Sequence, residues 1–400
     1  MKFNTRMRMF FLVTILLNMS ASFTHPVTPT IFTNLNLGSY MFGYALAAMM
    51  CANFATSPFW GMINTYISSR KSLLICGIGY GLGQVMFALA THEWQFIVAR
   101  VFAGVFTGGA FVSIMTYIVN VSDNAEQRGT YLTINATIQA VAGAFGYFVG
   151  GLLGGINTYL PVWIQSATLA LCGVLFYIVC KKDDTISIKD MKIKILAKKA
   201  NPFVAFVASR QFMTFTLLGL FLMCVFQNLS YTAFDQTFNY YICDQFAFPS
   251  TYNGFIKGGM GFISLIANST ICIWLIKHTD IKKSIIGVFT LCTFSMAVAV
   301  LIEQIVPFVV INIALFAFNS ISMPVLQALV AQRGTDSNRN LIMGFYNAMK
   351  SLGGIIGAFL AGWLYDFNAK FPFYMVIIGF ALAVICGICY YFQSKKEVLN

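Results

Sequence analysis

One acidic side chain lies inside a long apolar segment, a placement typical of residues that take part in ion or proton chemistry. Asp235 falls within the apolar stretch at residues 209–243, whereas the remaining acids lie in polar segments, at the ends of apolar stretches or in the tails. A charged residue inside a membrane helix costs about 2.5–3.5 kcal/mol on insertion scales and usually marks an ion or substrate pathway. Asp235 is therefore a candidate for proton coupling and substrate binding. Alternatively, it reaches water from the outer end of a long helix.

Polar residues accompany Asp235 at helical spacing. Together with Asp235, three of them occupy positions i, i+3, i+7 and i+11, which places all four on one face of a helix. They are Asn228, Tyr231, Asp235 and Asn239. We expect this face to line a cavity. Phe234 and other aromatic side chains would contribute apolar and cation–π contacts to a lipophilic or cationic ligand there.

A histidine next to two prolines is the second titratable candidate. His25 precedes Pro26 and Pro29, which should bend the first apolar segment. The imidazole is a candidate for proton or substrate handling. A buried histidine that is simply hydrogen-bonded is the commoner case, and both interpretations stay open.

Three cationic side chains also lie at membrane depth. Buried Arg and Lys usually face a cavity or pair with an acid. We expect Arg100 to act in a charge network or a proton relay, and Lys350 either to join such a network or to bind an anionic substrate. Lys257 could simply reach the outer interface. Asn135 and Gln139 would line the substrate cavity.

Twelve apolar stretches must position these residues. A membrane-spanning helix needs about 20 mostly apolar residues, and 58% of this chain is hydrophobic while 10% is charged. The sequence therefore predicts an all-α membrane protein. The predicted spans are 8–32, 39–63, 72–91, 95–119, 130–155, 161–180, 209–243, 253–276, 284–304, 307–331, 341–365 and 372–393.

The basic residues lie mainly on one side of these spans. With the N-terminus in the cytoplasm, 21 of the 25 Lys and Arg residues fall at the cytoplasmic face, and Lys370 lies in an outer loop. This asymmetry follows the positive-inside rule. We expect a multi-pass protein of the cell membrane with both termini in the cytoplasm. The net charge of +12 then reflects topology rather than nucleic-acid binding.

The spans divide into two related halves. The predicted parts are an N-terminal six-helix bundle at 1–180, a cytoplasmic linker at 181–208 and a C-terminal six-helix bundle at 209–400. An offset of 211 residues places Gly43 on Gly254 and Gly151 on Gly362. Internal repeats of this kind predict a substrate site near the bilayer midplane between the halves, and alternating access by rocking of one half against the other.

Several functional classes fit the sequence poorly. It contains no Gly-x-x-x-x-Gly-Lys-Ser/Thr loop for ATP, and its ten cysteines lie mostly in apolar stretches as packing residues. We expect no cofactor and no metal. No soluble module would carry a signal, and Asp235 lacks the second acid that an intramembrane enzyme would need. A secondary transporter fits best, acting as a monomer on a small molecule and protons among membrane lipids.

Short motifs resemble those of one transporter family. They are Pro26-Val27-Thr28-Pro29, Ser57-Pro58-Phe59-Trp60-Gly61 followed by Arg70-Lys71, Arg100-x-x-x-Gly104, Gly143-x-x-Gly146-Tyr147-x-x-Gly150-Gly151 and Ala233-Phe234-Asp235. In these motifs the chain resembles the major facilitator superfamily, and within it the 12-span drug:proton antiporters and the quinolone efflux pumps of Gram-positive bacteria. The resemblance implies two six-helix bundles, a proton-transfer role for Arg100 and an acidic site at Asp235.

The chain departs from the family pattern at three positions. Thr65 and Ser68 stand where the signature loop has an acid and a glycine, and Tyr147 stands where the fifth helix has a proline. The acid normally helps to latch the outward state. Our interpretation is proton-coupled export of lipophilic or amphiphilic compounds. The alternative is a proton-coupled uptake symporter for a small nutrient or organic anion, with Lys350 as its anchor.

Overall fold

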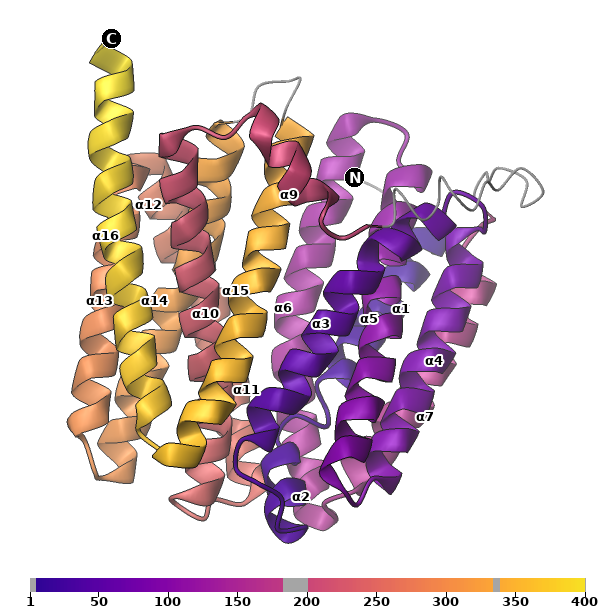
Figure 1. The fold of residues 1–400 in the computed structure, drawn as a ribbon. Helices are drawn as coiled ribbons and strands as arrows, with labels where there is room; N and C mark the ends of the chain where they lie inside the picture. The colour runs from indigo at the N-terminus through magenta and orange to yellow at the C-terminus, as the bar shows by residue number, and fades with distance from the viewer. Residues whose placement is uncertain (1–4, 183–200, 334–338, 400) are drawn as a thin grey trace. The chain divides into compact units, whose positions relative to one another are not determined.

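The computed structural model describes residues 5–182, 201–333 and 339–399, and these fold into helices joined by short loops (Figure 1). No strand occurs in the described ranges. The elements are α1 (Thr5–Ala21), α2 (Thr28–Asn34), α3 (Met41–Ile63), α4 (Ser69–Leu89), α5 (Glu93–Val121), α6 (Ala125–Ile156), α7 (Leu160–Val179), α9 (Val204–Ala208), the 3-10 turn η2 (Ser209–Gln211), α10 (Phe215–Asp244), α11 (Ser250–Ala267), the π-helical turn η3 (Asn268–Cys272), α12 (Ile273–His278), α13 (Ile281–Leu301), α14 (Ile305–Gln332), α15 (Arg339–Phe367) and α16 (Phe371–Leu399). The prediction of an all-α protein is confirmed. Most of the predicted linker, residues 183–200, lies outside the described residues.

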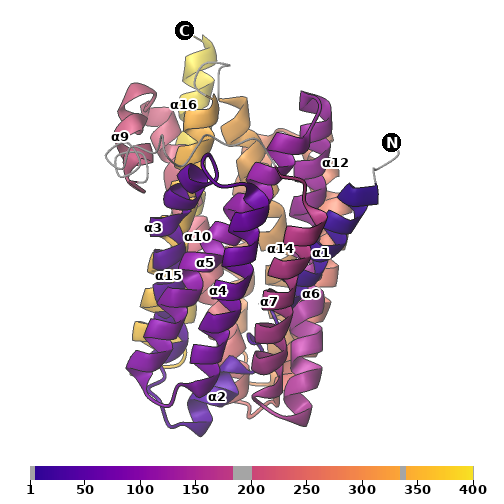
Figure 2. The same cartoon turned by 90° about the vertical axis from the view of Figure 1, so that its right-hand side faces the viewer.

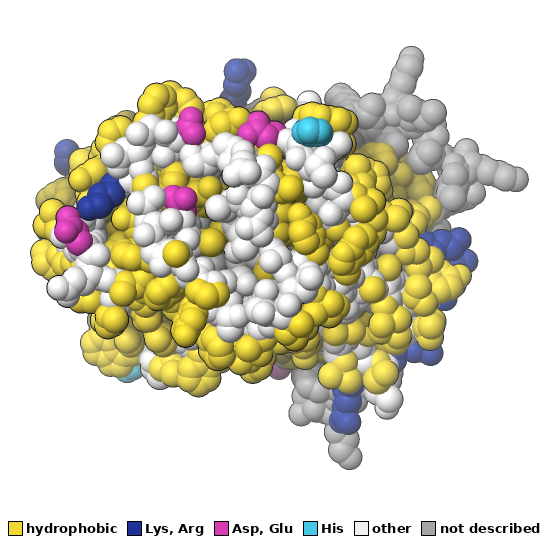
Figure 3. Space-filling model, turned by 90° about the horizontal axis from the view of Figure 1, so that it is seen from below, with side chains coloured by type: hydrophobic (Ala, Val, Ile, Leu, Met, Phe, Trp, Pro, Cys, Tyr) yellow, Lys and Arg dark blue, Asp and Glu magenta, His cyan; other side chains and the backbone are white. Residues whose placement is uncertain are grey.

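Ten of the described helices are long and apolar enough to cross a membrane. They are α4, α5, α6, α7, α10, the continuous α11–η3–α12 helix, α13, α14, α15 and α16. With α1–α2 and α3 they cover the twelve predicted spans. At the lower end of the helices, the face drawn in Figure 3 carries few acidic and basic side chains. Along the helices, large hydrophobic side chains such as Ile178 and Phe294 are exposed. Such a surface suits lipid rather than water as its main solvent.

The first of two compact units consists of Met1–Leu37, Ala48–Pro202 and Ala247–Gly261. Within it, α4 packs against α5 and α7, and α1 packs against α6 and α7 (Figure 1 and Figure 2). The core of this unit includes the rings of Phe10 and Phe176, whose centroids lie 5.5 Å apart.

The first predicted span is interrupted rather than merely bent. Helix α1 ends at Ala21, the chain turns, and α2 starts at Thr28 with Pro29 in its first turn. Proline lacks the N–H that would continue the backbone ladder. Gln165 of α7 compensates for the broken ladder: its Oε1 accepts a hydrogen bond from the Thr24 N–H at 3.0 Å, and its Nε2 donates to the Ala21 carbonyl at 3.2 Å.

The second compact unit consists of Gly38–Ala47, Phe203–Phe246 and Phe262–Asn400. Helix α10 packs against α15 and α16, and α13 packs against α14 and α16. Aromatic rings fill the interior, as in the edge-on pair of Phe221 and Phe345 at 4.7 Å. The contacts of α10 with its neighbours fix the helix that carries half of the predicted site residues.

An arginine ties the ends of α14 and α16 together in this unit. Arg333 Nη1 pairs with Glu397 Oε2 at 2.6 Å, Nη2 donates to Ser394 Oγ at 2.6 Å, and Nε donates to Tyr390 Oη at 3.1 Å. The fork geometry of a guanidinium allows these three bonds from one side chain. Thr216 at the start of α10 donates to the same Glu397 carboxylate.

The internal repeat reappears as equivalent glycine contacts inside the two units. In the first unit, a Cβ on Gly254 of α11 would lie 2.7 Å from the Cα of Gly151 of α6. In the second unit, a Cβ on Gly43 of α3 would lie 2.8 Å from the Cα of Gly362 of α15. The offset of 211 residues relates the two pairs. Small residues let helix backbones approach this closely, so the repeated glycines have a packing role in both units.

Candidate functional site

Helix α10 carries five of the predicted site residues. Its start is fixed by Thr214, whose side chain accepts a hydrogen bond from the Leu217 N–H at 3.2 Å. A capped start of this kind satisfies one of the free backbone donors of a helix. The five residues are Asn228, Phe234 and Asn239, which are buried, and Tyr231 and Asp235, which are half-buried.

A buried amide network cross-links α10 to α14. Asn228 Nδ2 donates to Gln227 Oε1 at 2.7 Å and to the Cys224 carbonyl at 3.0 Å. Gln227 Nε2 donates in turn to Asn319 Oδ1 of α14 at 3.1 Å. Gln227 and Asn319 are 0% and 2% exposed. Sequence reasoning missed both, although two adjacent amides in an apolar helix are a signal for an interhelical hydrogen bond.

The Asp235 carboxylate lies among polar side chains of its own helix. Gln236 Nε2 donates to Asp235 Oδ2 at 3.2 Å. Tyr231, one turn earlier, lies close enough to interact electrostatically with the carboxylate. Phe234 is fully buried instead, with its ring centroid 5.9 Å from that of Phe238. The structure thus places Tyr231 beside Asp235, and Phe234 in an aromatic cluster.

Lys350 of α15 lies near a thiol that also contacts Asn228. The half-buried ammonium group interacts electrostatically with Cys224. Asn228 Nδ2 lies 3.7 Å from the Cys224 sulfur. The second unit therefore brings Lys350 and Asn228 together around Cys224, an arrangement that combines a cation with an amide donor.

Arg100 of α5 occupies the interior of the first unit. Its side chain is 7% exposed, and its guanidinium carbon lies 4.1 Å from the centroid of the Phe87 ring. Nη1 lies 3.9 Å from the Met49 sulfur. The Tyr80 hydroxyl interacts with the guanidinium and lies close to Gln165, the residue that supports the break between α1 and α2. A chain of buried polar groups thus runs from Arg100 toward that break.

His25 lies in the break itself and stacks on an aromatic ring of α6. The imidazole and Tyr147 rings are 5.2 Å apart and inclined by 14°. Lys257 of α11 places its Nζ 5.9 Å from the centroid of the same tyrosine ring. Lys257 is 4% exposed, so the structure does not place it at an interface with water, contrary to the simpler expectation. Tyr147 gives both titratable side chains an aromatic contact.

The two remaining predicted residues lie one turn apart on α6. Asn135 is 1% exposed, and its Oδ1 has no hydrogen-bond partner among the described residues. Gln139 is half-buried. Further along α6, Gly150 packs against the backbone of Phe23 in the break after α1. The amides therefore share the helix that passes the His25 segment.

The loop between α3 and α4 is held by neutral hydrogen bonds. Thr65 Oγ1 in the loop donates to the Met62 carbonyl at 2.7 Å. Just before the loop, Trp60 Nε1 of α3 donates to the Val105 carbonyl of α5 at 2.8 Å. Ser68 is buried and directly precedes α4. Thr65 stands where the signature loop described above has an acid. Its hydroxyl therefore supports the loop through a hydrogen bond to nearby backbone rather than through a charge.

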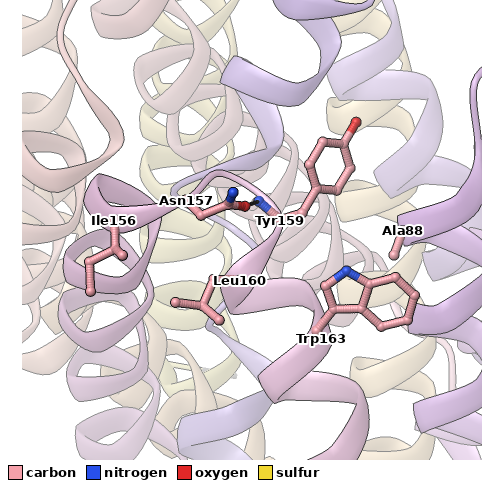
Figure 4. Close-up of a pocket in the computed structure, with 6 residues that line it drawn as sticks. All are labelled: Ala88, Ile156, Asn157, Tyr159, Leu160 and Trp163. Carbon is pink, nitrogen blue, oxygen red and sulfur yellow. Dashed lines mark hydrogen bonds between the residues drawn. The ribbon is translucent and has the colours of Figure 1, made fainter.

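A pocket of about 680 Å³ lies near the loop between α6 and α7 (Figure 4). Its lining residues are Ala88, Ile156, Asn157, Tyr159, Leu160 and Trp163. Asn157 Oδ1 accepts a hydrogen bond from the Tyr159 N–H at 2.9 Å. The pocket contains none of the predicted site residues, and its Trp and Tyr suit a membrane–water interface. We do not assign it as the transport site.

Comparison with known proteins decides the family. The sequence model described as Major Facilitator Superfamily matches residues 10–318 and 283–400. The chain belongs to the Major Facilitator Superfamily. It is therefore a membrane transporter of small molecules and not an enzyme.

Relatives of this superfamily member match it along nearly its whole length. Multidrug resistance protein 2 of Bacillus subtilis (strain 168) is 21% identical over 389 residues, covering 93% of this chain and 91% of the relative. Quinolone resistance protein NorA of Staphylococcus aureus (strain MSSA476) is 21% identical over 369 residues, covering 90% and 89%.

Solved structures of other transporters share the fold. The nucleoside transporter NupG superposes with a TM-score of 0.72 at 13% identity, covering 98% of this chain and 100% of that one. A bacterial homolog of the human lysosomal transporter Spinster gives a TM-score of 0.77 at 11% identity, covering 97% and 96%. A D-xylose–proton symporter gives 0.70 at 14% identity, covering 96% of each chain. The predicted major facilitator fold is confirmed.

Proposed function

We propose that this transporter exports lipophilic or amphiphilic small molecules in exchange for protons, by alternating access. Asp235 is the observation on which the proposal depends: a half-buried acid in a membrane-spanning helix, beside Tyr231 and Gln236. An acid in such a place usually marks an ion or substrate pathway. The multidrug and quinolone resistance proteins that match this chain along its length support export rather than uptake.

In the proposed cycle, Asp235 binds either a proton or a cationic substrate. The ionised carboxylate attracts the substrate, and Asn228, Tyr231 and Asn239 supply polar contacts on the same helix. Protonation of the carboxylate removes its charge and releases the substrate. Arg100 and His25 would pass protons within the first unit, and Asn135, Gln139, Phe234 and Lys350 would complete the contacts with the substrate.

The remaining organisation is part of the same proposal. Two six-helix bundles at 1–180 and 209–400 and the cytoplasmic linker at 181–208 would form a monomer. The bundles would lie in the cell membrane with both termini in the cytoplasm. The predominance of Lys and Arg in the cytoplasmic segments supports this orientation.

The proposal is tested with purified protein in liposomes that enclose a pH-sensitive dye. Ethidium, a planar lipophilic cation, is added on one side and proton movement is followed. We expect protons to move opposite to ethidium in the wild type, and the coupled movement to be lost in Asp235→Asn. Asp244→Asn is the matched control, because Asp244 is an exposed acid at the end of the same helix. Normal coupling in Asp235→Asn would disprove the assigned role of this acid.

A proton-coupled uptake symporter is the second candidate. The position of Lys350 near Cys224 and Asn228 favours it, because a half-buried cation beside an amide donor suits an organic anion. In this case the substrate and protons would move in the same direction. Loss of uptake in Lys350→Gln, with uptake retained in Asp235→Asn, would favour the symporter over the exporter.

A further inference from the structure

Arg100 is a buried cation that contacts uncharged groups. The guanidinium lies 4.1 Å from the Phe87 ring and 3.9 Å from the Met49 sulfur, and it interacts with the Tyr80 hydroxyl. In the part of the chain that the structure describes, no carboxylate pairs with it. A buried charge is costly unless an opposite charge and hydrogen bonds compensate it. The guanidinium carries five N–H donors that could serve such a partner.

A buried polar side chain of α4 has no hydrogen-bond partner among the described residues. Gln84 of α4 is 1% exposed, and both Oε1 and Nε2 are buried without a hydrogen bond in the described ranges. Buried polar atoms in proteins are nearly always hydrogen-bonded, so each exception calls for an explanation. An amide with both polar atoms unused is what a binding site offers before its ligand arrives.

The spacing on α4 places Gln84 on the same helix face as two residues that interact with the arginine. Tyr80, Gln84 and Phe87 occupy positions i, i+4 and i+7, which share one helix face. Tyr80 interacts electrostatically with Arg100, and the guanidinium lies over the Phe87 ring. The same face approaches α5 closely, since a Cβ on Gly83 would lie 2.9 Å from the Cα of Ala103. Gln84 therefore shares a helix face with two residues that interact with the guanidinium.

We propose that Arg100, Gln84 and Tyr80 form a site for a monovalent anionic group, which rests on the proposed transport function and names a further substrate class. The guanidinium, the amide Nε2 and the tyrosine hydroxyl supply donors, and no acid of the described residues pairs with the arginine in competition with an anion. A carboxylate suits a guanidinium through paired N–H···O bonds. The Phe87 ring and Met49 provide apolar contact for the rest of an amphiphilic carboxylate. A halide ion from solution carries the same charge and is the alternative occupant of the site.

The site is tested by ligand binding to the purified full-length protein in detergent. Thermal unfolding is followed by tryptophan fluorescence with sodium benzoate, with benzamide as the neutral isostere, and with sodium chloride. A ligand that binds the folded state raises the unfolding midpoint. We expect benzoate to raise it and benzamide to leave it unchanged. A chloride effect equal to that of benzoate would support an inorganic anion as occupant, and a benzoate effect alone would support a substrate carboxylate.

Two variants make the test specific. Arg100→Gln removes the charge, and Gln84→Glu keeps it but places a carboxylate where the anion would bind. We expect the benzoate shift to disappear in both, and to persist in Gln332→Glu, an exposed control at the end of α14. If Arg100→Gln does not fold, Gln84→Glu decides alone. A benzamide shift as large as that of benzoate, a shift retained in Gln84→Glu, or no shift with either anion would overturn the site. None of these outcomes involves proton flux, so the test of Asp235 is unaffected.

Discussion

At the scale of single residues, buried amides determine how α10 is held. Gln227 is the central member, because it accepts a hydrogen bond from Asn228 and donates one to Asn319. All three side chains are buried. A buried amide that loses its hydrogen-bond partner still has the full desolvation penalty, with no hydrogen bond to offset it. The network is therefore a sensitive point of the second unit.

The first prediction concerns this network. Gln227→Leu should lower the free energy of unfolding by about 1–3 kcal/mol, because Asn319 loses its donor. The double variant Gln227→Leu/Asn319→Leu should recover part of the loss, since both partners are then apolar. Thermal unfolding in detergent measures both. A double variant that is as unstable as the sum of the two single variants would show that the amides do not interact.

The sequence could predict one side of this network and not the other. Asn228 follows from its helical spacing with Asp235, which is a local pattern. The partner of Gln227 lies 92 positions further along the chain, and only the packing of α10 against α14 brings it near. The contact of Arg100 with Phe87 and the stacking of His25 on Tyr147 could not be predicted from the sequence either, because they also depend on how separate helices pack.

At the scale of elements, glycines set how closely the helices approach. Gly362 of α15 lies against Gly43 of α3, and Gly151 of α6 lies against Gly254 of α11. Other glycines on the same helices have open space: no atom would lie within 4 Å of a Cβ on Gly344 of α15. One helix thus carries both a tightly packed glycine and a free one.

The second prediction compares these two glycines. Gly344→Ala should stabilise the protein by up to about 1 kcal/mol, because alanine is the better helix former and meets no obstacle. Gly362→Ala should destabilise it by about 1–3 kcal/mol through overpacking. Unfolding midpoints of the two variants in detergent measure the difference. Equal shifts would mean that the close approach of α15 and α3 is absent.

The third prediction concerns the break between α1 and α2. Gln165→Leu removes the acceptor of the Thr24 N–H and the donor to the Ala21 carbonyl. We expect a loss of about 1–3 kcal/mol in unfolding free energy, because the broken helix then leaves backbone groups unsatisfied. Gln332→Leu, at an exposed end of α14, serves as the control. An equal, small effect of both changes would argue that the break is supported by other contacts.

The sequence was enough to predict where the helices lie, but it predicted the break between α1 and α2 only in part. Spans follow from the length and polarity of local segments. The prolines at 26 and 29 predict a bend, whereas a full interruption from Ala21 to Thr28 also depends on the Gln165 side chain of α7. That contact joins residues more than a hundred positions apart and leaves no local pattern.

At the scale of the whole molecule, the distribution of charge sets the expected topology. The basic residues collect in alternate loops and in the two tails. The membrane fold and the superfamily follow from the helices and the family match. The orientation in the membrane is a separate expectation that depends on the positive-inside rule.

The fourth prediction tests this orientation. A fluorescent protein fused after Asn400 should fluoresce in intact bacterial cells, and alkaline phosphatase fused at the same point should be inactive, because the C-terminus is expected in the cytoplasm. A phosphatase fused after Lys370 should be active. Activity of the C-terminal phosphatase fusion would reverse the proposed topology.

The direction of coupling is the central claim, and one measurement tests it most directly. Purified protein is reconstituted into liposomes with ethidium on both sides, and a pH gradient of either sign is imposed while ethidium movement is followed. We predict that ethidium moves against the direction of proton flow, reverses when the gradient is reversed, and stops responding in Asp235→Asn. Ethidium movement in the same direction as the protons would contradict antiport and establish symport in its place.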